Sequence, residues 1–223
     1  MNLYVLVEDS GSGKRVYKAW FKLLFPFHSE VDSVGEVTHN NYYLISGHGY
    51  PSYLDRIPKA LSDIRDHGNI QHFIVCIDAE DSPRTEKLRE IQEIAAACPQ
   101  IASLHIVVHD CCLETWFLGH SEMMRRNPHS VRLCEYKRHY DVSRRDPELM
   151  NCIESSDVKA QFHYRYLKEM LSEQQLIYTK YSPGPVSQKP YFDALIQRYK
   201  TTNHIATFGE FIDICTRISS QTR

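Results

Sequence analysis

Residues 72–82, HFIVCIDAEDS, restrict the fold more than any other part of the chain. Residues 73–77 form an unbroken run of apolar, β-forming side chains, which is typical of a strand buried on both faces of a parallel sheet. The run ends in three acids, Asp78, Glu80 and Asp81. Ligands bind at the carboxyl ends of such strands, and clustered carboxylates of this kind hold Mg²⁺. The alternative is a solvated loop whose aspartate caps the next helix.

The same alternation of strand and helix extends over the first half of the chain. Apolar runs predict strands, and apolar residues at helical spacing predict helices between them. The second helix begins at either Pro51 or Pro58 and ends at Gly68, and residues 28–41 look polar and irregular. This order predicts an α/β fold with a parallel sheet and helices on both faces over residues 1–123. The predicted strands are 3–7, 42–45, 73–77 and 104–108, and the predicted helices are 14–25, one ending at 68, 84–97 and one starting near 113.

Carboxylates follow three of the four predicted strands. Glu8 ends the first, the acids from Asp78 onward end the third, and Asp110 and Glu114 follow the fourth. If these strands are neighbours, the acids converge, and like charges that converge favour a bound divalent cation. Each acid also has a simpler explanation. Glu8 would suit an exposed strand end, and Glu114 would suit the first turn of any helix because of the helix dipole.

The sequence Ser10-Gly11-Ser12-Gly13-Lys14 superficially suggests a phosphate-binding P-loop. That motif requires a further glycine five residues before the glycine that precedes the lysine, and Glu8 holds this position. A phosphate-cradling loop is therefore not expected. The segment instead makes a turn, with Ser12 as the expected N-cap of the following helix.

The acids carry a resemblance to a known family. The strand ending in Glu8, the later IDAED and the following CLETWFLG resemble, in order and spacing over residues 1 to about 120, the Toprim domain. They most resemble the small stand-alone RloB-like and OLD-related Toprim proteins of bacterial defence loci, whose third motif reads roughly Glu-x-Trp. Two positions depart from that family: Glu80 replaces an aspartate, and Asp9-Ser10 replaces a glycine found in many members.

The resemblance implies Mg²⁺- or Mn²⁺-dependent cleavage of phosphodiester bonds. Glu8 takes the place of the general acid/base, and Asp78 and Glu80 take the place of the metal-binding pair. We expect Asp81 to assist with the metal and Glu114 to complete the catalytic group. Because proteins of this family often act with an SMC-like or ABC-type ATPase, and this chain has no recognisable ATP site, such an ATPase is the expected partner.

Net charge and cysteine content further restrict which ligands and surroundings the sequence predicts. The net charge of −2 gives no general sign of nucleic-acid binding, so any such surface must be local. The seven cysteines include no CxxC pair and several lie in apolar runs, which predicts reduced core cysteines and makes a zinc site improbable. No signal peptide or span-length apolar stretch is evident, so a soluble, cytoplasmic protein without a membrane partner is expected.

The second half of the chain, residues 124–223, predicts a basic connecting segment followed by helices packed on the sheet. Residues 125–145 hold seven Lys or Arg against two acids, a local charge of +5. This segment either contacts a nucleic-acid backbone or is a solvated connection or docking surface. The candidate phosphate contacts are Lys137, Arg138, Arg144, Arg145 and, in a later loop, Lys180. The scattered histidines, His109 among them, are expected to be structural.

Two functions are compatible with these features. The first is a nuclease acting on DNA or RNA, as the effector of a bacterial anti-phage defence system. The second is a non-catalytic Toprim adaptor that binds nucleic acid or the ATPase. Acids at three strand ends favour the enzyme, since an adaptor does not need them. The sequence does not decide DNA against RNA, endonuclease against exonuclease, or monomer against homo-oligomer.

Overall fold

A computed structural model describes residues 1–98, 102–154 and 158–221. Its centre is a five-stranded sheet in which every pair of neighbours is parallel. The order is β2-β3-β1-β4-β5, so the first strand of the chain lies in the middle. The strands are β1 (Leu3–Val7), β2 (Ser29–Val31), β3 (Asn41–Ser46), β4 (His72–Asp78) and β5 (Ser103–His109). The predicted α/β class is confirmed.

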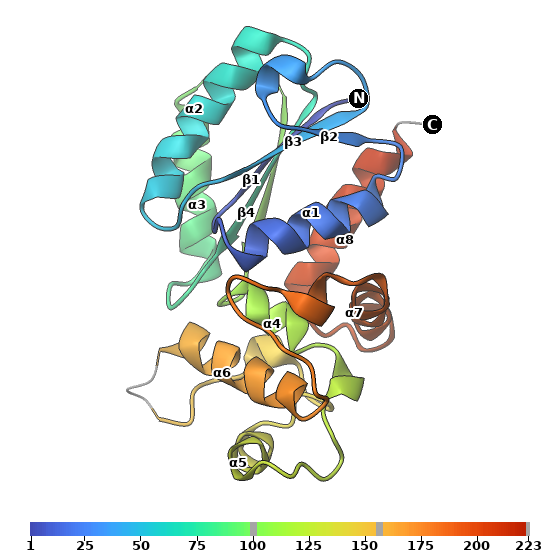
Figure 1. Cartoon of the computed structure of the whole chain (residues 1–223). Helices are drawn as coiled ribbons and strands as arrows, with labels where there is room; N and C mark the ends of the chain where they lie inside the picture. Colours follow the sequence, from blue (N-terminus) through green and yellow to red (C-terminus); the bar gives the residue numbers. More distant parts are fainter. Residues whose placement is uncertain (99–101, 155–157, 222–223) are drawn as a thin grey trace.

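Helices cover both faces of this sheet (Figure 1). On one face lie α2 (Ser52–His67) and α3 (Arg84–Ala96), whose apolar stripes bury Ile57, Ile64 and Ile91. On the other lie α1 (Ser12–Leu24) and α8 (Ala206–Ser220), which bury Trp20 and Phe211. The helices α1 and α8, which are far apart in the sequence, therefore form one layer on this face of the sheet.

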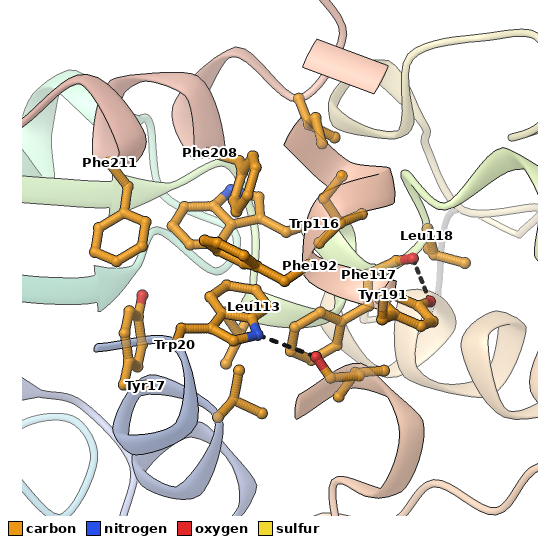
Figure 2. Close-up of a cluster of buried hydrophobic side chains, with 14 of the residues drawn as sticks. Tyr17, Trp20, Leu113, Trp116, Phe117, Leu118, Tyr191, Phe192, Phe208 and Phe211 are labelled. Carbon is orange, nitrogen blue, oxygen red and sulfur yellow. Dashed lines mark hydrogen bonds between the residues drawn. The ribbon is translucent and has the colours of Figure 1, made fainter. Parts of the chain in front are cut away.

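The remaining helices form an extension below the carboxyl edge of the sheet (Figure 1). An aromatic cluster joins this extension to the α1 layer (Figure 2). In it, Trp20 stacks on Trp116, with ring centroids 6.4 Å apart, and also contacts Phe192 and Phe208. The predicted helical C-terminal region is thus packed on the sheet through a continuous core. The helices of the extension are α4 (Leu113–Phe117), α5 (Val131–His139), α6 (Lys159–Ser172) and α7 (Lys189–Thr202).

Two local expectations are wrong, and the one for the second helix is confirmed in its Pro51 form. Residues 29–31 form an edge strand within the segment expected to be irregular, because they pair with residues 41–43. Gly11, not Ser12, is the N-cap of α1. The second helix begins after Pro51 and tolerates Pro58 inside it, and Gly68 ends it with a left-handed φ of 73°, as predicted. The helix expected near 113 begins at Leu113 and is short, ending at Phe117.

The chain changes direction within the sheet between β1 and β4. After β1 it passes through α1 on one face to β2 and β3, whereas after β4 it passes through α3 on the other face to β5. Adjacent strands whose connections leave in opposite directions leave a crevice at their carboxyl ends, and ligands of open α/β sheets bind there. Glu8 and Asp78 stand at this crevice.

Candidate active site

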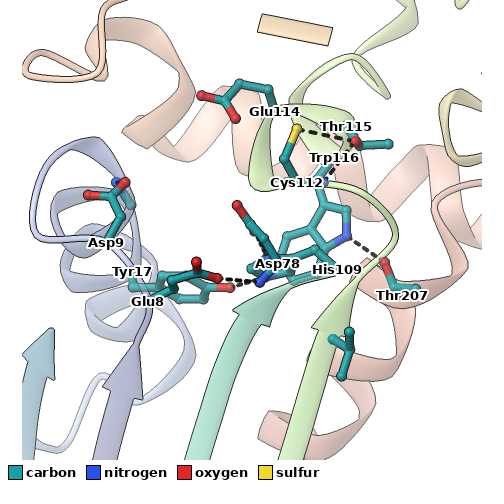
Figure 3. A network of polar contacts seen from close by, with 12 residues as sticks. Glu8, Asp9, Tyr17, Asp78, His109, Cys112, Glu114, Thr115, Trp116 and Thr207 are labelled. Atoms are coloured by element: carbon teal, nitrogen blue, oxygen red, sulfur yellow. Dashed lines mark hydrogen bonds and ion pairs between the residues drawn. The ribbon is translucent and has the colours of Figure 1, made fainter. Parts of the chain in front are cut away.

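Glu8 and Asp78 meet at the crevice, as the sequence predicts. Glu8 follows β1 directly and Asp78 is the last residue of β4, the neighbouring strand. The backbone N–H of Asp78 donates a hydrogen bond to Glu8 Oε2 at 2.8 Å. The two carboxylates therefore share one small volume. Figure 3 shows Glu8 and Asp78 facing this crevice. Together with Glu80, whose charge acts on Glu8, they are called the acidic edge below.

Glu8 is a strongly perturbed acid. Burial raises the pKa of Glu8 to about 8, and the charges of Asp78 and Glu80 add to this rise. The hydrogen bond from the Asp78 N–H opposes the shift without cancelling it. A carboxyl group with such a pKa can hold or release a proton near neutral pH, which is what general acid/base chemistry requires.

His109, which we expected to be structural, fixes one side of Asp78. It ends β5, at the position that the register places beside Asp78, and it is buried. Its Nδ1 lies 2.5 Å from Asp78 Oδ1, and its Nε2 lies 2.5 Å from the Tyr17 hydroxyl. A carboxylate can only accept, so Nδ1 donates to Asp78 and Nε2 accepts from Tyr17. The sequence signal was available, since both residues end adjacent strands.

The other two acids after β4 lie toward solvent. Glu80 has a left-handed φ of 53°, and its N–H donates to the carbonyl of Cys111 at 2.7 Å, which ties the loop to the end of β5. Asp81 is exposed and does not cap α3, whose N-cap is Pro83 without a side-chain hydrogen bond. The simple cap explanation for these acids is therefore wrong. Glu80 is close enough for its charge to raise the pKa of Glu8.

Glu114 is nearby but in a different environment. Its side chain is 2% exposed, and Oε1 accepts hydrogen bonds from the Tyr178 hydroxyl and from Lys180 Nζ, both at 2.8 Å. Burial alone would lower the pKa of Lys180, but the Glu114 carboxylate outweighs it and raises that pKa. Glu114 Oε2 is buried without a hydrogen-bond partner among the described residues. Tyr178, far away in sequence, gave no signal that it would lie here.

The loop after Glu8 does not present its amides to a phosphate. The carboxylate of Asp9 accepts hydrogen bonds from the N–H groups of Gly11 and Gly13. The N–H of Ser12 is bonded to the carbonyl of Lys180 at 2.6 Å. The amides that a P-loop would offer are thus already bonded, which agrees with the sequence argument against that motif.

Two hollows adjoin the acidic edge. A cavity of about 20 Å³ lies among the side chains of Glu8, Asp78 and His109, enough for one water molecule or one small ion. Beside it, an open hollow of about 310 Å³ is lined by residues of the loop after β1, by His48 and by Lys180. The larger hollow can admit a segment of polymer backbone next to the carboxylates.

The predicted nucleic-acid contacts lie in separate places. Lys180 is close to the acidic edge, whereas α5, which carries Lys137 and Arg138, lies at the far end of the extension, where α6 separates it from the sheet (Figure 1). The end of the basic segment packs on α7, whose Arg198 donates to the carbonyls of Ser143 and Arg145. The ammonium of Lys137 donates to two backbone carbonyls, at 2.7 and 2.9 Å, and so holds the segment's own turn. Arg145 lies over the ring of Tyr140, and Arg138 and Arg144 are exposed.

The donor set of the acidic edge suits Mg²⁺. Hard oxygen ligands are what this ion prefers, and it is commonly held by one or two carboxylates, with water and substrate phosphate as the remaining ligands. Glu8 and Asp78 supply two adjacent carboxylates. Burial raises the pKa of Glu8 and the charge of Asp78 raises it further, so a cation bound between the two carboxylates would favour their ionised forms. Among the described residues, only Cys111, Cys112 and His163 form a group of three potential metal ligands whose ligand atoms all lie within 4.8 Å of one another.

A scan against protein-family models and searches of curated proteins and of solved structures found no match to this chain. The likeness to Toprim proteins therefore rests on the residues quoted above. Among the described helices, none combines the length and the apolar character needed to cross a membrane.

Proposed function

We propose that the protein is a Mg²⁺-dependent nuclease that cleaves phosphodiester bonds in DNA or RNA. The observation that carries this proposal is the pairing of Glu8 with Asp78 at the switch point of the sheet, where burial and like charge raise the pKa of Glu8 to about 8. A fold that only needed stability or a docking face would gain nothing from two adjacent, partly buried acids.

The roles of the residues follow from their contacts. Asp78 and Glu80, with Glu8, would hold Mg²⁺, which when bound neutralises phosphate charge and lowers the pKa of a coordinated water. Glu8 holds or releases the proton that cleavage must move. His109 keeps Asp78 oriented through the bond to Oδ1, and no other described residue forms a hydrogen bond with Oδ2. Lys180, half exposed beside the larger hollow, offers a positive charge to a phosphate.

The biological setting is part of the same proposal. We place the nuclease as the effector of a bacterial anti-phage defence system, working with an SMC-like or ABC-type ATPase. This rests on the resemblance of Glu8, IDAED and CLETWFLG to stand-alone Toprim proteins. A non-catalytic adaptor is the competing function, and the experiment below separates the two.

The test compares cleavage by wild type, Glu8→Gln and Asp78→Asn. Each is incubated with DNA or RNA and with Mg²⁺ or Mn²⁺, alone and with a candidate ATPase partner. Glu8→Gln keeps the size of the side chain but cannot exchange protons, so cleavage should fall by roughly two to four orders of magnitude while substrate binding survives. Asp78→Asn should lose metal affinity as well, because an amide is a poorer ligand for Mg²⁺.

Glu93→Gln is the matched control, since Glu93 is exposed on α3 and belongs to neither hollow near Glu8. It should cleave like wild type. If the reconstituted wild-type complex cuts neither nucleic acid with either metal, while Glu8→Gln keeps full anti-phage protection, the adaptor function replaces the nuclease.

A further inference from the structure

A second group of potential metal ligands lies behind the acidic edge. The sulfur atoms of Cys111 and Cys112 and a ring nitrogen of His163 all lie within 4.8 Å of one another. All three residues are buried, with exposures of 2% or less. The cysteines sit between β5 and α4, and His163 comes from α6, some fifty residues further along the chain. The absence of CxxC pairs concealed this group, because adjacent cysteines and a distant histidine form no recognisable sequence motif.

The hydrogen bonds of His163 leave the appropriate nitrogen for a metal. Nε2 lies 3.2 Å from the carbonyl oxygen of Met150, which can only accept, so Nε2 carries the proton. Nδ1 then faces the Thr115 hydroxyl at 2.8 Å, and that hydroxyl lies 3.6 Å from the sulfur of Cys112. Metal-binding histidines commonly donate their second N–H to a backbone carbonyl in this way, which fixes the ring.

We propose that Cys111, Cys112 and His163 bind Zn²⁺. Two thiolates and one neutral imidazole form a donor set that zinc prefers over Mg²⁺, and their charges cancel that of the ion. Such a neutral centre suits a site that is closed to water. On binding, His163 Nδ1 exchanges its hydrogen bond with the Thr115 hydroxyl for the metal. Binding converts both thiols to thiolates and releases their two protons to solvent.

The proposed zinc has a structural role. Cys112 is the N-cap of α4, the helix that carries Glu114, whereas His163 belongs to α6. The carbonyl of Cys111 also accepts the N–H of Glu80. Cys111 has a left-handed φ of 75°, a conformation that is unfavourable for a non-glycine residue and that metal ligation would compensate. The ion would join the extension to the loop that carries the acidic edge.

The test is metal analysis of the intact, full-length protein. Wild type purified without chelator should contain one zinc ion per chain after dialysis against Mg²⁺ buffer. Replacement by Co²⁺ should give the near-ultraviolet charge-transfer absorption of thiolate ligands, which carboxylates at the acidic edge cannot produce. Removing zinc with a strong chelator should lower the unfolding temperature, and adding zinc should restore it.

Variants assign the ligands. Cys111→Ser with Cys112→Ser, and separately His163→Gln, should lose the zinc, whereas Cys215→Ser, which changes an equally buried cysteine of α8, should keep it. Wild type that is folded but contains no zinc and gives no thiolate band with Co²⁺ overturns the proposal. Retention of stoichiometric zinc by the double cysteine variant also overturns it. If the variants do not fold, the Co²⁺ spectrum of wild type decides alone.

Discussion

Glu8 and Glu114 are two glutamates at the same edge of the sheet in opposite electrostatic situations. Glu114 is buried beside a cation and a phenol, with Lys180 Nζ and the Tyr178 hydroxyl each 2.8 Å from its Oε1. Glu8 accepts a backbone N–H and lies beside further acids, and no described lysine or arginine forms an ion pair with it. Both side chains are at least partly buried. They differ in whether a neighbouring cation compensates the charge of the carboxylate.

The difference separates a site that can take up a cation or a proton from one that already has its cation. Burial and the neighbouring acids raise the pKa of Glu8 to about 8, so this carboxyl group can change its charge near neutral pH. Glu114 instead uses its charge to hold the loop of residues 176–188 against α4. Reactivity is therefore expected at Glu8, and stability is expected from Glu114.

The largest expected effect concerns the pH dependence of stability at Glu8. Burial and the charge of Asp78 raise the folded-state pKa of Glu8 from 4.5 to about 8, so between these values the folded state keeps a proton that the unfolded state releases. Stability therefore falls as pH rises through this window, by on the order of 3 kcal/mol. Glu8→Gln should remove most of this fall, measured by chemical unfolding at pH 5 and pH 9 without divalent metal.

Adding Mg²⁺ to the same unfolding experiment tests whether the ionised acids bind the metal. At pH 9 it should stabilise wild type, because the ionised carboxylates then attract it, and at pH 5 it should have little effect. Glu8→Gln should respond less to Mg²⁺ at pH 9. Parallel pH profiles for wild type and Glu8→Gln would mean that Glu8 is not the perturbed acid.

The second prediction concerns Glu114. Removing its neighbouring cation should leave its charge uncompensated, as the charge of Glu8 is. Lys180→Met keeps much of the side-chain length but leaves a buried carboxylate paired only with Tyr178. Breaking a fully buried pair costs about 3–5 kcal/mol, and because Lys180 is half exposed we expect a loss of about 2–3 kcal/mol. Lys189→Met is the control, since its ion pair with Asp193 is exposed on both sides and should contribute less than about 1 kcal/mol. Equal losses for the two variants would contradict the difference between the glutamates.

The third effect tests whether His109 belongs to the reactive side of this comparison. His109→Leu removes the hydrogen bond to Asp78, so we expect roughly ten- to a hundredfold weaker Mg²⁺ binding by calorimetric titration, as for other residues that orient metal ligands. His105→Leu, on the same strand but bonded to His72, should leave Mg²⁺ affinity unchanged. If His109→Leu binds Mg²⁺ as tightly as wild type, His109 contributes only to packing.

The sequence predicted the parallel sheet, its buried strands and the meeting of Glu8 with Asp78. These features depend on local patterns, an apolar run followed by an acid, and parallel strands bring their carboxyl ends to one edge. The sequence did not predict Tyr178 or Lys180 as partners of Glu114, because their positions depend on how a distant loop packs. It also missed the edge strand at residues 29–31, whose short, polar sequence gives no periodic signal.

The smallest effect concerns Arg138, Arg144 and Arg145, exposed cations of the basic segment for which, unlike Lys180, no ion pair with a buried acid occurs among the described residues. Changing Arg138, Arg144 and Arg145 to Glu should weaken nucleic-acid binding. The slope of log affinity against log salt should become shallower by about 0.9 for each phosphate that these side chains neutralise in wild type. Lys137 is left intact because it holds backbone carbonyls. The matched control is Arg89→Glu on α3. An unchanged slope would identify the segment as a solvated connection or a surface for a protein partner.

The position of α8 has a consequence for how the chain is made. Its side chains Phe208 and Phe211 pack on Tyr17 and Trp116, which belong to segments translated about ninety residues or more earlier. During synthesis the part of the sheet that α8 covers stays exposed until residues 206–220 have left the ribosome, so the native packing around His109 and Trp116 cannot form before then. A nascent or prematurely terminated chain thus lacks the packing that shapes the crevice. For a proposed nuclease, this delays activity until residues 206–220 have been made and packed.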